Sequence, residues 1–256
     1  MSLIWLKFLA AAATLLVGLL GGLLPRRWEG RVGVEHALSA ASAFAGGIFL
    51  GAGLIHLLPD GISALGRAFP SLQYPLGALV CALGFGGLLA LEQGILRGQD
   101  VDALGAAGPL LAYVLLVALS LHSVLAGVAL GVETAHAQVL VLLLAIVAHK
   151  GGAGFALGIS LQRSGLARGR SLGMLLMFAC MTPLGIGLGS GIARQLAGTA
   201  GRIFEGTVDC LAAGTFLYVA TMEVLGREFH NCHHPLRNLL AAASGLGLMA
   251  LIAIWT

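Results

Sequence analysis

Two matching segments each place one histidine inside a long apolar stretch of the chain. HSVLAGVALG at 122–131 and HKGGAGFALG at 149–158 align at an offset of 27 residues, and they share the His, an Ala-Gly pair and a final Ala-Leu-Gly. An imidazole is costly in lipid, so it normally faces the interior of a helix bundle or an aqueous path. Two histidines in equivalent settings therefore predict one shared polar site, formed by His122 and His149.

The two histidines lie on consecutive predicted helices, at 108–131 and 138–161, which about six residues connect. So short a connection makes the helices antiparallel neighbours, and both histidines then come near the middle of the membrane. Imidazole binds late divalent transition metals, zinc foremost, and serves magnesium or calcium poorly. With the hydroxyl of Ser123, the carboxylate of Glu223 and water, the pair could bind one ion. The alternative is that each ring hydrogen-bonds to a backbone carbonyl.

Lys150 follows directly after His149 in the same apolar stretch. An ammonium at the centre of a bilayer costs roughly 2.5 to 3.5 kcal/mol on insertion scales unless it is paired or hydrated. We therefore expect a partner for Lys150, with Glu223 as the first candidate and Glu133 or Asp209 as candidates nearer the surface. Snorkelling is the alternative, but several helical turns separate this lysine from either surface.

The composition is that of an integral membrane protein. Of the 256 residues, 58% are hydrophobic and 10% are charged, whereas about a quarter are charged in soluble domains. The 39 glycines fall inside the apolar stretches, as they do in closely packed transmembrane helices. The net charge of +3 comes from arginines in short loops that form no continuous basic surface, which excludes a nucleic-acid partner.

The apolar pattern predicts an all-α membrane protein, with residues 1–256 forming a single transmembrane domain. Eight stretches each have roughly the 20 residues that span about 30 Å of hydrocarbon. An even number of spans puts both termini on one side. Most arginines follow the first, third, fifth and seventh stretches, so the positive-inside rule places those loops in the cytoplasm and both termini outside it. The predicted helices span residues 3–24, 34–57, 74–96, 108–131, 138–161, 171–193, 203–226 and 236–255.

Three further groups of polar residues mark a predicted pathway for the ion. His56 and Asp60, at the outer end of the second helix, could collect ions or could simply form a helix end that faces water. In the sixth helix Thr182 precedes Pro183, which predicts a kink because proline removes a backbone hydrogen bond. The last cytoplasmic loop carries clustered soft donors, which predicts capture of released metal, with a merely polar loop as the alternative. These donors are His230, Cys232, His233 and His234.

The sequence lacks the motifs of two classes of membrane-embedded protease. It contains no HExxH, the signature of a zinc protease. It also lacks the Gly-x-Ser-Gly of rhomboid-type proteases around Ser190, because Leu188 holds the first position. We expect no enzymatic activity and no resident cofactor, the only metal being the transported ion.

Six segments together resemble the ZIP (Zrt/Irt-like) family of divalent metal transporters, closest to the branch of animal plasma-membrane zinc importers. The similarity runs from about residue 34 to the C-terminus and recurs in order over six helices. The segments are FAGGIFLGAGLIHLLPD, GFGGLLALEQ, HSVLAGVALG, HKGGAGFALGISL, CMTPLGIGLG and AAGTFLYVATMEVL.

The resemblance implies a 3+2+3 bundle of eight helices with both termini extracytoplasmic. Helices one to three and six to eight would form an inverted repeat, and helices four and five would carry the metal. It also implies a homodimer in a plasma or inner membrane and an elevator-like movement of the ion. The implied function is transport of Zn²⁺ or Fe²⁺ into the cytoplasm.

The sequence departs from the family pattern at the expected metal ligands. The family carries His-x-x-x-Glu on the fourth helix, but Ala126 holds the position of the glutamate here. On the fifth helix Ala153 holds the position of a glutamate found in many members. The missing carboxylate leaves open that the protein is a metal-binding sensor or a non-transporting partner. Positions that hold a second metal in other members are Ser123, Lys150 and Thr182, so we expect one ion.

Overall fold

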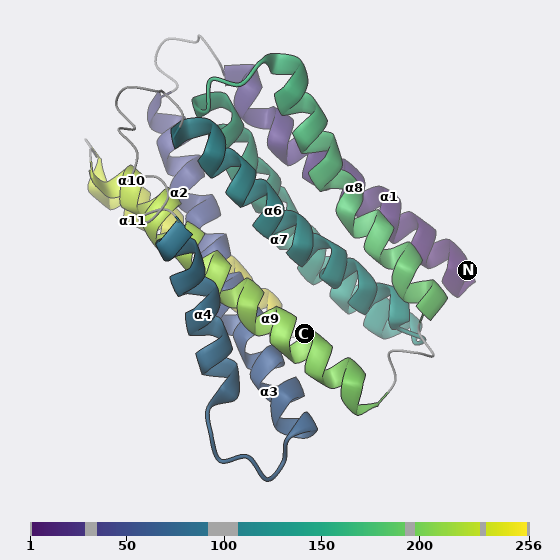
Figure 1. Ribbon diagram of the computed structural model, residues 1–256. Helices are drawn as coiled ribbons and strands as arrows, with labels where there is room; N and C mark the ends of the chain where they lie inside the picture. The colour runs from purple at the N-terminus through teal and green to yellow at the C-terminus, as the bar shows by residue number, and fades with distance from the viewer. Residues whose placement is uncertain (1, 29–34, 92–106, 193–197, 231–233, 255–256) are drawn as a thin grey trace.

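A computed structural model describes residues 2–28, 35–91, 107–192, 198–230 and 234–254, which form a bundle of helices (Figure 1). No strand occurs within these ranges, and the all-α prediction is confirmed. The α-helices are α1 (Leu3–Leu23), α2 (Glu35–Gly51), α3 (Leu58–Ala68), α4 (Leu76–Leu91), α6 (Ala107–Val132), α7 (His136–Arg163), α8 (Arg168–Ile192), α9 (Thr199–Tyr218), α10 (Gly226–His230) and α11 (Pro235–Ile252).

Seven helical runs within the described residues are long and apolar enough to cross a membrane, so the protein is a multi-pass membrane protein. The eighth predicted helix is present as α4, whose apolar run Leu76–Ala90 is shorter. The last part of that predicted helix, 92–96, lies outside the described residues. The seven runs are Leu3–Arg27, His36–Ala68, Ala112–Val132, His136–Arg163, Arg168–Gly191, Thr199–His230 and Pro235–Ile252.

Two of the predicted helices continue beyond the ends that the apolar pattern gave them. The second passes through a π-helical segment, η2 (Ala52–Leu57), into α3, and the seventh passes through another, η4 (Val219–Leu225), into α10. Helical structure therefore reaches Ala68 and His230. The apolar pattern marks where the chain leaves the lipid, but the backbone hydrogen bonds of a helix also form in more polar surroundings. Each of these two helices therefore ends later than the apolar pattern predicts.

Close backbone contacts at glycines attach α6 and α7 to different neighbours. A Cβ at Gly127 would meet the carbonyl oxygen of Thr182 in α8, and one at Gly154 would meet the carbonyl oxygen of Gly18 in α1. Residues without a side chain permit this approach. These glycines of the two matching segments therefore pack α6 on α8 and α7 on α1.

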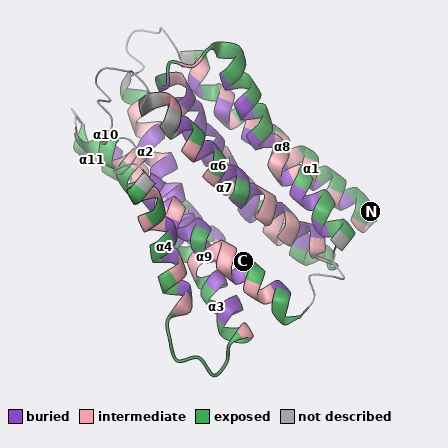
Figure 2. Ribbon diagram, in the orientation of Figure 1, coloured by how far each residue is buried: buried purple, intermediate pink, exposed green. Residues whose placement is uncertain are grey.

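The helices form two groups that meet along α6 and α7. One group contains α1, α6, α7 and α8, and the other contains α2, α3, α4, α9 and α11 (Figure 1). Contacts between the groups join α2 to α7 and α6 to α9. Exposed residues cover the outer faces and buried residues lie between the helices (Figure 2). The two histidine-bearing helices thus lie where the groups adjoin.

Candidate metal site

His122 of α6 and His149 of α7 meet across the helix pair. Their Nε2 atoms are 3.3 Å apart and their ring centroids are 5.4 Å apart. The two residues are 5% and 3% exposed, so both are buried. Phe216 of α9 packs edge-on against the His122 ring at a centroid distance of 4.7 Å. The structure thus brings together the two imidazoles that the repeated segments singled out.

A third imidazole lies beside this pair. The His56 ring centroid is 6.3 Å from that of His149, and His56 Nδ1 is 2.8 Å from Asp60 Oδ2. His56 lies in η2, where the N–H of Leu58 donates to the carbonyl of Gly53, five residues earlier. Such wide turns are frequent at functional sites. The sequence placed His56 only at the outer end of a helix, and its approach to His149 was not predicted.

Lys150 is 2% exposed and is held by groups of α6 and α8. Its ammonium donates to Ser123 Oγ at 2.8 Å and to the Phe178 carbonyl at 3.2 Å, and it lies 3.8 Å from the centroid of the Phe178 ring. These partners offset the cost of a buried ammonium. The prediction that Glu223 is this partner was wrong, because an uncharged hydroxyl, a carbonyl and an aromatic face take that place.

Glu223 lies in a different cavity from the one that reaches the histidines. Its Oε2 is 2.7 Å from Arg227 Nη2, one turn further along the helix. Both residues line a small cavity of about 40 Å³, together with Arg163 and Tyr218. Glu223 therefore lies beside Arg163 and Arg227. This position does not support its predicted role as a ligand.

A cavity of about 450 Å³ reaches both histidine rings from the opposite end. Four acidic and two basic side chains line it, so the lining carries more negative than positive charge. Glu205 and Asp209 had not been singled out as pathway residues, although their spacing of four on an apolar helix puts both on one face. The charged residues are Asp60, Glu133, Glu205, Asp209, Arg67 and Arg202. We call this space the histidine vestibule.

The remaining predicted residues lie apart from the ring pair or outside the described ranges. Thr182 is fully buried and its hydroxyl has no hydrogen-bond partner among the described residues. His230 ends α10, and the ring of His234 packs edge-on against His36 at a centroid distance of 4.9 Å. Cys232 and His233 lie outside the described residues.

Two neutral imidazoles do not by themselves complete a metal site. Within the described ranges, no group of three or more His, Cys, Asp or Glu side chains is arranged to hold one ion. Ala126, where the resemblance places a carboxylate, lines the vestibule beside His122. Water, or His56 after a movement toward the pair, would therefore have to supply the remaining ligands.

Comparison with known proteins identifies the family. The model of the family described as ZIP zinc transporter matches residues 4–97 and 96–253. The chain belongs to the ZIP family. This membership confirms the resemblance predicted from the six segments.

Curated relatives of this ZIP-family protein cover most of its length. Human zinc transporter ZIP1 is 32% identical over 258 residues, covering 86% of this chain and 79% of the relative. Mouse zinc transporter ZIP2 is 32% identical over 267 residues, covering 86% of each. Human zinc transporter ZIP3 is 28% identical over 308 residues, covering 95% of this chain and 97% of the relative. The family is one of transporters and not of enzymes.

Proposed function

We propose that this ZIP-family protein carries divalent transition-metal ions into the cytoplasm, Zn²⁺ foremost and Fe²⁺ second, through one site formed by His122 and His149. The observation that carries this proposal is the 3.3 Å separation of the two Nε2 atoms. Two nitrogen ligands of a tetrahedral zinc ion, at bonds of about 2.0 to 2.1 Å, are roughly 3.3 to 3.4 Å apart. The ring pair is therefore spaced to bind one such ion with little movement.

The neighbouring ammonium favours a single, weakly held ion. Lys150 occupies the position next to His149 and is bonded to Ser123, the residue next to His122. In its protonated form Lys150 opposes a second dication in the low dielectric of the membrane interior. Neutral imidazole ligands with no adjacent carboxylate bind a dication less tightly than a charged set. Weak binding suits transport, because the ion must also leave.

The acidic lining of the histidine vestibule suits the collection of cations. Carboxylates that line a cavity with low-dielectric walls raise the local concentration of cations and their rate of arrival. Asp60 bonds to His56, which lies beside His149, so His56 connects one acidic group of the vestibule to the ring pair. We assign to these residues the entry of the ion, with His56 as a third donor to it.

Two cavities of unequal size favour an outward-facing state. The vestibule measures about 450 Å³ and the cavity at Glu223 about 40 Å³. By the arginine distribution, the first lies on the extracytoplasmic side and the second on the cytoplasmic side. In this proposal, the ion pairs of Glu223 with Arg227 and of Glu228 with Arg163 close the inner side and break when the site turns inward. The inverted repeat, the homodimer, and a plasma or inner membrane location remain predictions.

Uptake into proteoliposomes tests this function. His122→Ala and His149→Ala should each abolish uptake of radioactive zinc, because one imidazole cannot hold the ion. His136→Ala is the matched control, since this exposed histidine begins α7 outside the vestibule. It should leave uptake unchanged. Uptake that survives the loss of both His122 and His149 would rule out the site.

The second candidate function is metal sensing without translocation, which the alanine at position 126 favours. A sensor would bind zinc at the histidine pair, measured by titration calorimetry on purified protein, and would show no flux into liposomes. A transporter would show both. The same two histidine variants should abolish binding in either case, so the flux measurement separates the two functions.

A further inference from the structure

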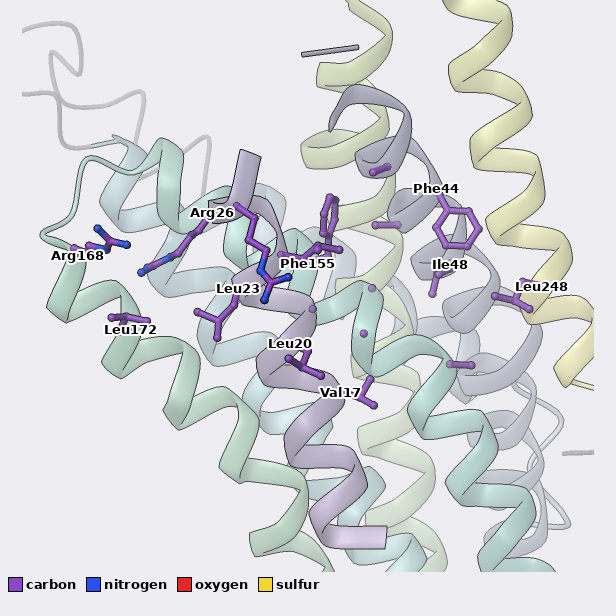
Figure 3. Close-up of a pocket in the computed structure, with 18 residues that line it drawn as sticks. Val17, Leu20, Leu23, Arg26, Phe44, Ile48, Phe155, Arg168, Leu172 and Leu248 are labelled. Atoms are coloured by element: carbon purple, nitrogen blue, oxygen red, sulfur yellow. The ribbon is translucent and has the colours of Figure 1, made fainter. Parts of the chain in front are cut away.

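A larger cavity lies away from the histidine vestibule, between α1, α2, α7 and α8. It measures about 780 Å³ (Figure 3). Of the 18 described residues that line it, 15 are apolar residues or glycine, and the other three are Arg26, Arg27 and Arg168. No acidic side chain is among them. The volume is within the range of about 300 to 1,000 Å³ in which proteins hold small ligands.

The apolar lining runs lengthwise along three helices. It extends from Val17 in α1 to Leu24 directly after that helix, from Ala41 to Ile48 in α2, and from Ala148 to Phe155 in α7. Each stretch covers two helical turns, or about 10 Å. Glycine and alanine supply much of the lining of α7, which keeps the space between the helices open. These stretches give the cavity an apolar wall about 10 Å long, against which part of an alkyl chain can pack. We call this cavity the slot.

The three arginines gather at one end of the slot. Arg26 and Arg27 follow the C-terminal end of α1 and Arg168 begins α8, and in Figure 3 Arg26 and Arg168 lie on the side of the cavity away from Ile48 and Leu248. None of the three guanidinium groups makes a hydrogen bond or ion pair with any residue that the structure describes. Their charges are therefore available to an anion.

We propose that this slot binds a phospholipid with an anionic headgroup. The phosphate lies against Arg26, Arg27 and Arg168, and one acyl chain runs along α1, α2 and α7. Arginine matches phosphate because its planar fork donates two parallel hydrogen bonds. Basic pockets between transmembrane helices on the cytoplasmic side are suited to such headgroups, and the positive-inside rule places these arginines on that side. The proposal does not depend on metal transport.

Native mass spectrometry of delipidated protein tests the site. Phosphatidylglycerol and phosphatidylcholine with identical acyl chains are titrated separately, and we expect the anionic lipid to bind at least tenfold more tightly. The variant Arg26→Gln/Arg27→Gln/Arg168→Gln should lose this preference, because each arginine raises the affinity for the anionic lipid about fivefold. The control Arg170→Gln/Arg237→Gln removes exposed arginines of the same predicted surface that do not line the slot, and it should keep the preference.

A second variant separates the slot from simple charge attraction. Ala41→Phe places a phenyl ring in the slot, where it obstructs the acyl chain, and leaves all three arginines, so binding of phosphatidylglycerol should fall at least tenfold. Circular dichroism and thermal unfolding in detergent establish that each variant is folded. Equal binding of the two lipids by the wild type, or unchanged binding in either variant, would overturn the proposal. So would displacement of the lipid by millimolar glycerol 3-phosphate, because the acyl chain would then contribute nothing.

Discussion

Lys150 contacts Ser123 across α6 and α7 in the same register in which His149 meets His122. The ammonium lies 2.8 Å from Ser123 Oγ, and the two ring nitrogens lie 3.3 Å apart. Each contact joins residues 27 positions apart, which is the offset between the two matching segments. Two successive residues of each segment therefore meet across α6 and α7, and the second contact places the Lys150 amine beside the proposed metal site.

Replacing this lysine should strengthen metal binding. In Lys150→Met, a dication at the histidine pair no longer faces a nearby ammonium, so zinc affinity should rise on the order of tenfold. Titration calorimetry on purified protein measures the change. Lys7→Met is the control, because Lys7, the other lysine of the chain, donates to the carbonyl of Gly131 near the end of α6. Affinity that stays the same in Lys150→Met would mean that the ammonium does not oppose the ion.

Adding a carboxylate at position 126 should also strengthen binding. Ala126 lines the histidine vestibule one turn from His122, so Ala126→Glu places a charged oxygen beside the ring. Zinc affinity should rise by about tenfold or more, and uptake at low zinc should increase. Ala129→Glu, which lines the same vestibule a turn further along, is the matched control for added negative charge. A similar gain in both variants would indicate general attraction instead of ligation.

Thiol labelling should report which side each cavity faces. In a Cys232→Ser background, Ala129→Cys in the vestibule should react with a membrane-impermeant maleimide added outside cells. Ser160→Cys, which lines the cavity at Glu223, should not react from that side. The reverse pattern would invert the proposed topology. Breaking the inner ion pair with Arg227→Gln should speed labelling of Ser160→Cys from the cytoplasmic side.

Two glycine substitutions should change stability in opposite directions. A methyl at Gly154 meets the carbonyl oxygen of Gly18, so Gly154→Ala should destabilise the protein by about 1 to 3 kcal/mol through overpacking. A methyl at Gly187 in α8 would meet no atom of the described residues within 4 Å, so Gly187→Ala should stabilise by about 0.5 to 1 kcal/mol through lower chain entropy. Thermal unfolding in detergent measures both. Equal shifts would show that α1 and α7 are not in close contact.

The helices and the histidine pair were predictable because their signals are local. Long apolar stretches give the spans, and a short connection between two of them makes α6 and α7 antiparallel neighbours. His122 and His149 then fall at one depth. The ends of the second and seventh helices were misplaced, because Leu58–Ala68 and Gly226–His230 continue as helix after the apolar stretches end.

The sequence by itself determined the family, the membrane-spanning fold and the meeting of two imidazoles, since apolarity, spacing and repetition are properties of the chain. Only the tertiary structure decided that Lys150 bonds to Ser123 and Phe178, that Glu223 faces Arg227, and that His56 approaches His149. These contacts depend on how each helix is rotated about its own axis. That rotation is set by packing against distant helices, such as Gly154 on Gly18, which no local pattern encodes.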